Sequence, residues 1–265
     1  MIEMEQILRN YPDSLHTEKE FLLREYLQHE ILGILFTCKY AHKYTFLGGT
    51  CLRLCYGTER FSEDLDFDNV GLDRAEFEET ARIIKRQMEL RGFRMELRYA
   101  YKGAYHCSIK FPGLLYDYDL SGHREAKLLI KLDTEKQHFT YQRSLLPLDR
   151  FGIQTEVPAV PLDLLGSQKI AAILGRKRPK GRDFYDLRWI LHRSGLNYDY
   201  LDLRFGVKTP DALRQLVEER IAPFDFDLLA ADVRPFLFQD DDIEGVRNFP
   251  KFWRSVPLPP GPSSD

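Results

Sequence analysis

The chain has 265 residues, of which 43% are apolar and 13% aromatic, and its formal net charge is −3. This length and apolar content allow a full hydrophobic core in one or two domains. No apolar stretch approaches the roughly 20 residues that cross a membrane, which argues against the membrane-spanning class. The near-neutral charge gives no whole-chain signal for a nucleic-acid partner, so any such signal must come from local patches.

The cysteines and the first residues bear on the compartment. The chain contains four cysteines, Cys38, Cys51, Cys55 and Cys107, and none forms a Cys-x-x-Cys pair with histidines at zinc spacing. The seven histidines show no metal-ligand spacing either, and we assign them no role. Reduced thiols in a cytosolic protein are the simplest interpretation. Residues 1–13 are acidic and lack a long apolar core, unlike a signal peptide, so we expect a cytoplasmic protein with no membrane partner.

The first half of the chain predicts alternating helices and strands. Apolar residues at helical spacing predict helices, the second of which begins at Thr17, a suitable N-cap. Period-two alternation predicts strands, two of which form a hairpin around Lys102-Gly103-Ala104. The helices are expected over residues 2–9, 17–36 and 72–91, and the strands over 44–47, 64–68, 93–101, 105–111 and 127–134. This order predicts an α/β (α+β) layer, in which a mixed sheet carries helices.

From Pro161 the pattern becomes helical, and Pro161 itself suits a first helical turn. Helices are expected over residues 161–175, 183–192, 209–221 and 241–253. The stretch 176–182 between the first two has five basic residues in seven. We predict a catalytic domain with N-terminal helices over residues 1–155, a helical domain over 156–255 that completes the site, and a disordered tail over 256–265.

One stretch, residues 46–68, combines a glycine turn with a row of carboxylates. Gly48 and Gly49 follow a strand, where they allow a sharp turn and a close approach to a ligand. The helix that starts there offers free N–H groups to an anion. Three aspartates share one face of the next strand: Asp64, Asp66 and Asp68. Such carboxylates repel one another unless a cation such as Mg²⁺ lies between them. Together these features indicate metal-assisted chemistry on a nucleoside triphosphate.

The same residues resemble the signature of the polymerase-β-like nucleotidyltransferase superfamily, a Gly-Gly turn followed by an Asp-apolar-Asp-apolar strand. The fuller sequence GGTCLRLCYGTERFSEDLDFD is similar to the abortive-infection nucleotidyltransferase toxins of the AbiEii/AbiGii type, which belong to toxin–antitoxin or phage-defence pairs. The resemblance extends to QKIAAILGRKRPKGRDFYDLRWIL and covers roughly residues 44–191. It implies a nucleotidyltransferase fold, Mg²⁺ or alternatively Mn²⁺ as cofactor, and a nucleoside triphosphate substrate. It also implies an RNA acceptor such as the tRNA 3′ end and a cognate antitoxin protein.

The resemblance also implies roles for the carboxylates. Asp64 and Asp66 would hold metal. Members of the superfamily place a third carboxylate on a neighbouring strand, where it completes the metal site and deprotonates the attacking hydroxyl. Asp133 is the first choice for this position, and Asp117 and Asp119 are weaker alternatives. A surface salt bridge is the competing interpretation of Asp133.

The second block supplies the remaining catalytic residues. Lys169 would neutralise the triphosphate and Asp183 would be essential, while Asp186 lies on the same helix face as Asp183. Arg60 could grip a phosphate oxygen, but fixing the loop is an equal alternative. The predicted nucleotide-binding residues are Gly48, Gly49, Thr50, Arg53, Arg60, Ser62, Lys131 and Lys169.

Two other functions remain open from the sequence. The acceptor could be a protein or a small molecule instead of RNA, and the basic stretch 176–182 could be an ordinary solvated loop instead of an RNA contact. The other open function is that of a non-catalytic nucleotide-binding module. The joint presence of Asp64, Asp66, Lys169 and Asp183 argues against it.

Overall fold

The computed structural model describes residues 2–260 and divides them into two compact units. Unit 1 contains the chain up to Gly57 together with Phe61–Ala159, and unit 2 contains Thr58–Arg60 and the chain from Val160 onward. The short excursion Thr58–Arg60 was not predicted. The predicted boundary between residues 155 and 156 falls inside the last strand of unit 1, which ends at Ala159. No helix within the described residues is long and apolar enough to span a membrane.

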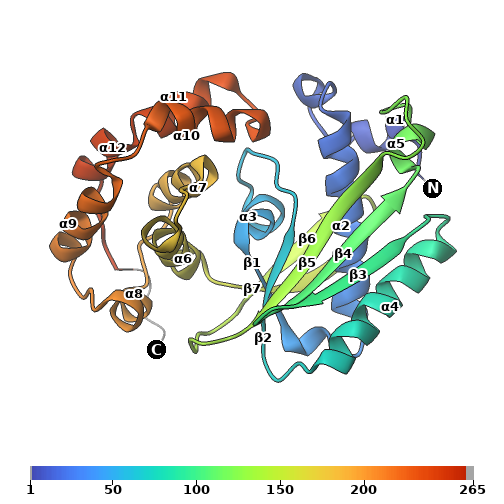
Figure 1. Cartoon of the computed structure of the whole chain (residues 1–265), viewed down its shortest axis with the longest axis horizontal. Coiled ribbons are helices and arrows are strands. Elements are labelled where there is room, and N and C mark those ends of the chain that lie inside the picture. Colours follow the sequence, from blue (N-terminus) through green and yellow to red (C-terminus); the bar gives the residue numbers. More distant parts are fainter. Residues whose placement is uncertain (1, 261–265) are drawn as a thin grey trace. The chain divides into compact units, whose positions relative to one another are not determined.

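Unit 1 is built on a seven-stranded mixed sheet in the order β3-β4-β5-β2-β1-β7-β6 (Figure 1). In its centre, β2 pairs antiparallel with β1 and parallel with β5, and β1 pairs parallel with β7. The strands are β1 (Tyr44–Leu47), β2 (Leu65–Asn69), β3 (Glu96–Tyr101), β4 (Tyr105–Pro112), β5 (Lys127–Lys136), β6 (Ser144–Arg150) and β7 (Ile153–Ala159). The predicted α/β class with a mixed sheet is confirmed, although β6 and β7 were not predicted.

Helices cover one face of this sheet. On β5, Leu128, Ile130 and Leu132 are buried while the residues between them are exposed or half-buried, as the period of two requires. The buried face packs under α2 and α4 (Figure 1). The unit 1 helices are α1 (Met4–Leu8), α2 (Lys19–Thr37), α3 (Gly48–Cys51), α4 (Arg74–Leu90) and α5 (Leu114–Asp117). The opposite face of β2, β3, β4 and β5 carries mainly polar side chains, and we call it the open face.

Local sequence explains where the two covering helices begin. The Asp73 side chain accepts a hydrogen bond from the Glu76 backbone N–H at 2.8 Å, so it caps α4. The predicted apolar stripe of α4 is buried as expected, from Phe77 to Met88. Helix α2 starts after Glu18, not at Thr17, and it is buried around most of its circumference. It therefore holds polar residues inside unit 1.

One of these polar residues, His29, gives unit 1 a pH-dependent stability. Its side chain is only 2% exposed and a ring nitrogen lies 2.7 Å from the Glu25 carbonyl oxygen. Burial lowers the pKa of His29 to about 4, opposed by Glu25 and assisted by Arg150 and Arg53. The unfolded chain, whose histidine titrates near pH 6.5, therefore binds the proton first as the pH falls.

We expect the full unfolding free energy to be kept above pH 6.5, where His29 is neutral in both the folded and the unfolded state. As the pH falls to about 4, the unfolded chain gains the proton and up to about 3 kcal/mol of unfolding free energy is lost. His29→Gln should flatten this part of the profile, measured by urea unfolding across the pH range. An unchanged slope in the variant would show that other groups cause the acid sensitivity.

Unit 2 is helical and has its own core. Phe184, Phe249 and Trp253 are fully buried, and the ring of Phe249 lies 4.9 Å from that of Phe184 and 6.0 Å from that of Trp253, centroid to centroid. The helices are α6 (Leu162–Gly175), α7 (Gly181–Leu191), α8 (Tyr198–Phe205), α9 (Pro210–Ile221), α10 (Phe226–Val233), α11 (Ile243–Arg247) and α12 (Phe249–Ser255). Helices α8 and α10 were not predicted.

The end of unit 2 differs from the prediction in two ways. The single helix expected over residues 241–253 is broken at Asn248, because Pro250 occupies the first turn of α12 and cannot continue a helix. The segment predicted as a disordered tail starts at residue 256, yet Val256 and Leu258 are buried in the unit 2 core. The rest of that predicted tail, residues 261–265, lies outside the described residues.

The excursion Thr58–Arg60 joins unit 2 through its backbone. Arg60 forms a β-bridge with Leu237, and the Phe238 N–H donates to the Glu59 carbonyl oxygen at 3.2 Å. Gly57, just before the excursion, has a φ of 84° and ends the π-helix Leu52–Tyr56, which follows α3. A residue with no Cβ adopts this left-handed conformation without strain.

Candidate active-site residues

Two predicted metal ligands lie side by side on the open face of unit 1. Asp66 on β2 and Asp133 on β5 are register partners on neighbouring parallel strands. Register partners project to the same face, so the two carboxylates are neighbours. Asp64 precedes β2, and its Oδ2 lies 3.4 Å from the Nζ of Lys131. The structure thus brings three predicted carboxylates and one predicted lysine to one region of the sheet.

The glycine turn belongs to the same region. Leu47, the last residue of β1, is the register partner of Asp66, and Gly48 follows it with a φ of 81°. A Cβ on Gly48 would lie 2.6 Å from Oδ2 of Asp66, closer than atoms can pack. Thr50 is buried, and its hydroxyl donates to the backbone carbonyl of Asp64. Only glycine therefore fits between the turn and the carboxylate.

Two further predicted residues are tied to α2. The Nε of Arg53 donates to Oε2 of Glu25 at 2.9 Å, and both side chains are buried. The backbone carbonyl of Ser62 accepts a hydrogen bond from Nε2 of Gln28 at 3.0 Å. These contacts hold the helix Leu52–Tyr56 and the loop before β2 against α2. The predicted nucleotide contacts of Arg53 and Ser62 stay predictions.

His106 is a member of this region that the sequence interpretation missed. It is the β4 register partner of Asp133, and its Nδ1 lies 3.0 Å from Oδ1 of that carboxylate. Alternation along residues 105–111 would have put His106 on the face opposite Cys107. Its pairing with Asp133 needs the register of two strands, which one sequence does not reveal.

The other predicted residues form a cluster in unit 2. Lys169 on α6 places Nζ 3.1 Å from Oδ1 of Asp183 and 2.7 Å from Oδ2 of Asp186, both on α7. Arg60 donates from Nε and from Nη2 to the two oxygens of Asp186, each at 2.6 Å. Arg60 and Asp186 are 1% and 0% exposed. Asp186 therefore holds two cations at once, and we call Arg60, Lys169, Asp183 and Asp186 the buried ion cluster.

The members of the buried ion cluster compensate for one another. Burial alone would lower the pKa of Lys169, but Asp186 and Asp183 outweigh it and the pKa is raised. Burial alone would raise the pKa of Asp186, but Arg60 and Lys169 outweigh it and the pKa is lowered. Lys169 and Asp186 are therefore both charged at neutral pH, in an interior where an unpaired charge would be very costly.

The weaker candidates lie elsewhere in their units. Asp117 forms an ion pair with Arg94 at 2.7 Å. Asp119 follows α5 with a φ of 55°. In the basic stretch 176–182, Arg176 pairs with Asp183 at 2.9 Å, and Arg182 lies over the ring of Phe236. Part of this stretch is thus engaged within unit 2.

The fit of these residues to Mg²⁺ rests on donor chemistry. Within the described residues, no three His, Cys, Asp or Glu side chains converge on a point that could hold a metal ion. Asp64 instead contacts Lys131, and Asp133 contacts His106. However, Mg²⁺ is commonly held by only one or two carboxylates and completed by substrate phosphates. The neighbouring Asp66 and Asp133 fit that kind of site.

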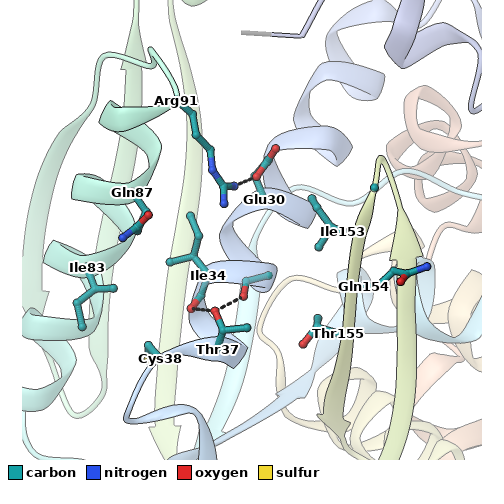
Figure 2. A pocket seen from close by; sticks show the side chains of 12 residues that line it. Glu30, Ile34, Thr37, Cys38, Ile83, Gln87, Arg91, Ile153, Gln154 and Thr155 are labelled. Atoms are coloured by element: carbon teal, nitrogen blue, oxygen red, sulfur yellow. Dashed lines mark hydrogen bonds and ion pairs between the residues drawn. The ribbon is translucent and has the colours of Figure 1, made fainter.

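One pocket in unit 1 lies away from these residues. It has a volume of about 480 Å³ and lies between α2, α4 and β7, on the helix-covered side of the sheet (Figure 2). The ion pair between Glu30 and Arg91 crosses it, beside Gln87 (Figure 2). None of the predicted site residues lines it.

Comparison with known proteins identifies the family. The profile described as "Nucleotidyl transferase AbiEii toxin, Type IV TA system" matches residues 31–252. No curated protein matched the sequence. Among solved structures, MenT4, a nucleotidyltransferase toxin from Mycobacterium tuberculosis, is similar with a TM-score of 0.57 and 16% identity over 97% of this chain and 91% of that one. JHP933 from Helicobacter pylori is similar with a TM-score of 0.53 and 16% identity over 88% of this chain and 91% of that one.

At these low sequence identities, the similarity to the solved structures supports the fold alone, whereas the family profile matches most of the chain. The resemblance inferred from the glycine turn and the aspartates is thereby confirmed. The chain belongs to the AbiEii nucleotidyl transferase family, the toxins of type IV toxin–antitoxin systems.

Proposed function

We propose that this protein uses Mg²⁺, or alternatively Mn²⁺, to transfer a nucleoside monophosphate from a nucleoside triphosphate to a hydroxyl group of RNA, such as the tRNA 3′ end. It would act in the cytoplasm, be paired with a cognate antitoxin and serve in phage defence. The observation that carries the proposal is the register of Asp66 with Asp133 beside the glycine turn at Gly48. It supplies adjacent hard ligands next to a glycine turn that brings the backbone close to them.

The proposed reaction is an in-line displacement at the α-phosphorus. The acceptor hydroxyl oxygen forms the new bond, its proton passes to Asp133, and pyrophosphate leaves. Asp64 and Asp66, with Asp133, would hold the metal, which when bound offsets charge on the phosphate oxygens. Gly48, Gly49 and Thr50 would bind phosphate, with Lys131 as a further cation.

The proposal gives the unit 2 residues an electrostatic role. Lys169 would neutralise the triphosphate, and Asp183 would hold Lys169 by the 3.1 Å contact that the two side chains make. Lys169→Met removes the positive charge that would face the nucleotide, so it should raise KM for the triphosphate.

A labelling experiment tests the proposed function. The purified protein is incubated with total RNA, Mg²⁺ and each α-labelled nucleoside triphosphate in turn, beside the Asp64→Ala/Asp66→Ala variant. Label in a tRNA-sized band that is absent with the variant would support the proposal and identify the base. Label in a protein or a small product would replace the RNA acceptor by another one. No label in any product would contradict nucleotidyl transfer.

Gly48→Ala should impair transfer much more than it impairs folding. The new Cβ would meet Oδ2 of Asp66 at 2.6 Å and displace a metal ligand. The left-handed backbone would cost about 1–2 kcal/mol of unfolding free energy. A displaced ligand should lower kcat by roughly 10–100-fold.

Gly57→Ala is the matched control for this variant. Gly57 has a φ of 84°, similar to that of Gly48, but a Cβ at Gly57 would have no neighbouring atom within 4 Å. Both variants should lose similar thermal stability, and only Gly48→Ala should lose activity. Equal losses of activity would mean that backbone strain, and not the position of Asp66, matters.

A further inference from the structure

The open face presents a row of cations that begins at the catalytic carboxylates. Lys131 on β5 contacts Asp64 and is the register partner of Ser108 on β4, which in turn pairs with Arg98 on the edge strand β3. Strands lie about 4.8 Å apart, so this row reaches about 14 Å from the carboxylates to the edge of the sheet. Lys110 lies two residues along β4 from Ser108 and therefore on the same face.

The charges of this row are only partly compensated. Among the described residues, no carboxylate forms an ion pair with Arg98 or Lys110. Glu96, the register partner of Lys110, is paired with Lys127 at 2.9 Å, so it offsets the charge of Lys110 only in part. Arg98 is exposed and Lys110 half-exposed. Two unpaired cations on a flat strand surface are available to an anionic ligand, and phosphate is the anion that arginine and lysine both bind well.

The side chains of the open face also indicate how it would recognise a nucleic-acid ligand. On the open face of β3, β4 and β5, all of which the structure describes, there is no Phe, Tyr or Trp on which a base could stack, and the ring of His106 is held against Asp133 at 3.0 Å. Tyr99 and Tyr101 alternate with Arg98, so they point to the other face. Contacts would therefore go to the backbone phosphates, which position a nucleic acid without reading its sequence.

We propose that the open face of β3, β4 and β5 is the acceptor track of this enzyme: Arg98 and Lys110 hold the phosphodiester backbone of a single-stranded RNA 3′ end, and Lys131 lies where this track meets the carboxylates. This inference rests on the proposed function and adds the direction in which the RNA acceptor lies on the protein. The terminal hydroxyl lies at Asp64, Asp66 and Asp133, and the preceding nucleotides extend across the sheet toward β3. The recognition is tolerant of sequence, and its strength depends on salt.

Charge reversal at the far end of the track tests this inference. The full chain carrying Arg98→Glu/Lys110→Glu is compared with wild type for binding of a mixed-sequence single-stranded RNA, by fluorescence anisotropy at several salt concentrations. Each lost phosphate contact removes about 0.7 from the slope of log affinity against log salt, so the slope should fall by about 1.4. Affinity should drop by at least about 10-fold, and KM for the RNA should rise while the affinity for the nucleoside triphosphate stays unchanged.

The matched control is Lys19→Glu/Arg86→Glu, which makes the same change of charge on exposed positions of α2 and α4, at the other face of the sheet. It should bind RNA nearly as wild type does. If the Arg98/Lys110 variant binds and uses RNA as wild type does, the track is wrong. If a polyglutamate peptide displaces the RNA from wild type at equal charge concentration, the face is a general acidic-protein site and the inference also falls.

The outcome is separable from that of the proposed function. If wild type transfers no nucleotide to RNA, the proposed function fails, yet the anisotropy measurement still decides whether this face binds RNA. If transfer to RNA occurs and Arg98→Glu/Lys110→Glu leaves the KM for RNA unchanged, the proposed function is supported and the acceptor track is contradicted.

Discussion

Asp66→Asn should lower nucleotidyl transfer by about 10³-fold or more while leaving the fold intact, because it removes a hard negative ligand at the centre of the predicted metal site. Asp64→Asn should act in the same direction. Asparagine keeps the shape of aspartate, and removing one of several neighbouring carboxylates relieves repulsion when no cation is bound. The melting temperature without metal should therefore stay the same or rise slightly. Steady-state kinetics with Mg²⁺ and a differential scan without it would check both parts.

Asp68→Asn is the control on the same strand and the same face. The Asp68 carboxylate accepts a hydrogen bond from the Tyr141 hydroxyl at 2.6 Å and is the register partner of Glu135. It lies outside the family motif, so the variant should keep most of its activity. If Asp68→Asn and Asp66→Asn lost activity equally, the predicted division of roles along β2 would be wrong.

The second large effect is expected for Asp186→Asn, which should lower the unfolding free energy by about 3–5 kcal/mol. Asp186 is fully buried and neutralises both Arg60 and Lys169, at 2.6 and 2.7 Å. Its replacement leaves two cations in the unit 2 interior with a single carboxylate, that of Asp183. Urea unfolding followed by circular dichroism would measure the loss.

A surface pair provides the comparison. Asp232 and Lys180 are 3.8 Å apart and both partly exposed, so Asp232→Asn should cost less than about 1 kcal/mol. The double variant Arg60→Met/Asp186→Leu should recover part of the loss, since it removes both members of one buried pair and leaves Lys169 paired with Asp183. A double variant less stable than Asp186→Asn would show that Arg60 contributes mainly by other contacts.

The sequence predicted the centre of the sheet well, and local reasons explain this success. Residues 44–47 form β1 as predicted, because a short apolar run ends at a glycine pair. Helix α4 lies close to its predicted range, since Asp73 caps it and Gly92 follows it. Strands β6 and β7 were missed because Pro147, Pro158 and their polar neighbours break the alternation that marks a strand.

The parts of the site that were missed depend on pairs far apart in the chain. Arg60 and Asp186 are separated by 126 positions, and no sequence pattern near either residue predicts their pairing. The contact between His106 and Asp133 follows from the register of β4 with β5, which neighbouring side chains do not determine alone. Lys169, Asp183 and Asp186 were named as candidates from the family motif, but their arrangement around Arg60 was not predicted.

The excursion Thr58–Arg60 limits how this protein can be divided or recombined. Because the chain enters unit 2 for three residues and then returns to unit 1, neither unit is one continuous piece of sequence. A fragment that ends at Ala159 would carry Arg60 without Asp186, and a fragment that begins at Val160 would carry Asp186 without Arg60. The two units are therefore not interchangeable modules. A gene fusion that supplied a new helical unit would also have to supply a carboxylate for this arginine, which ties the inheritance of one unit to that of the other.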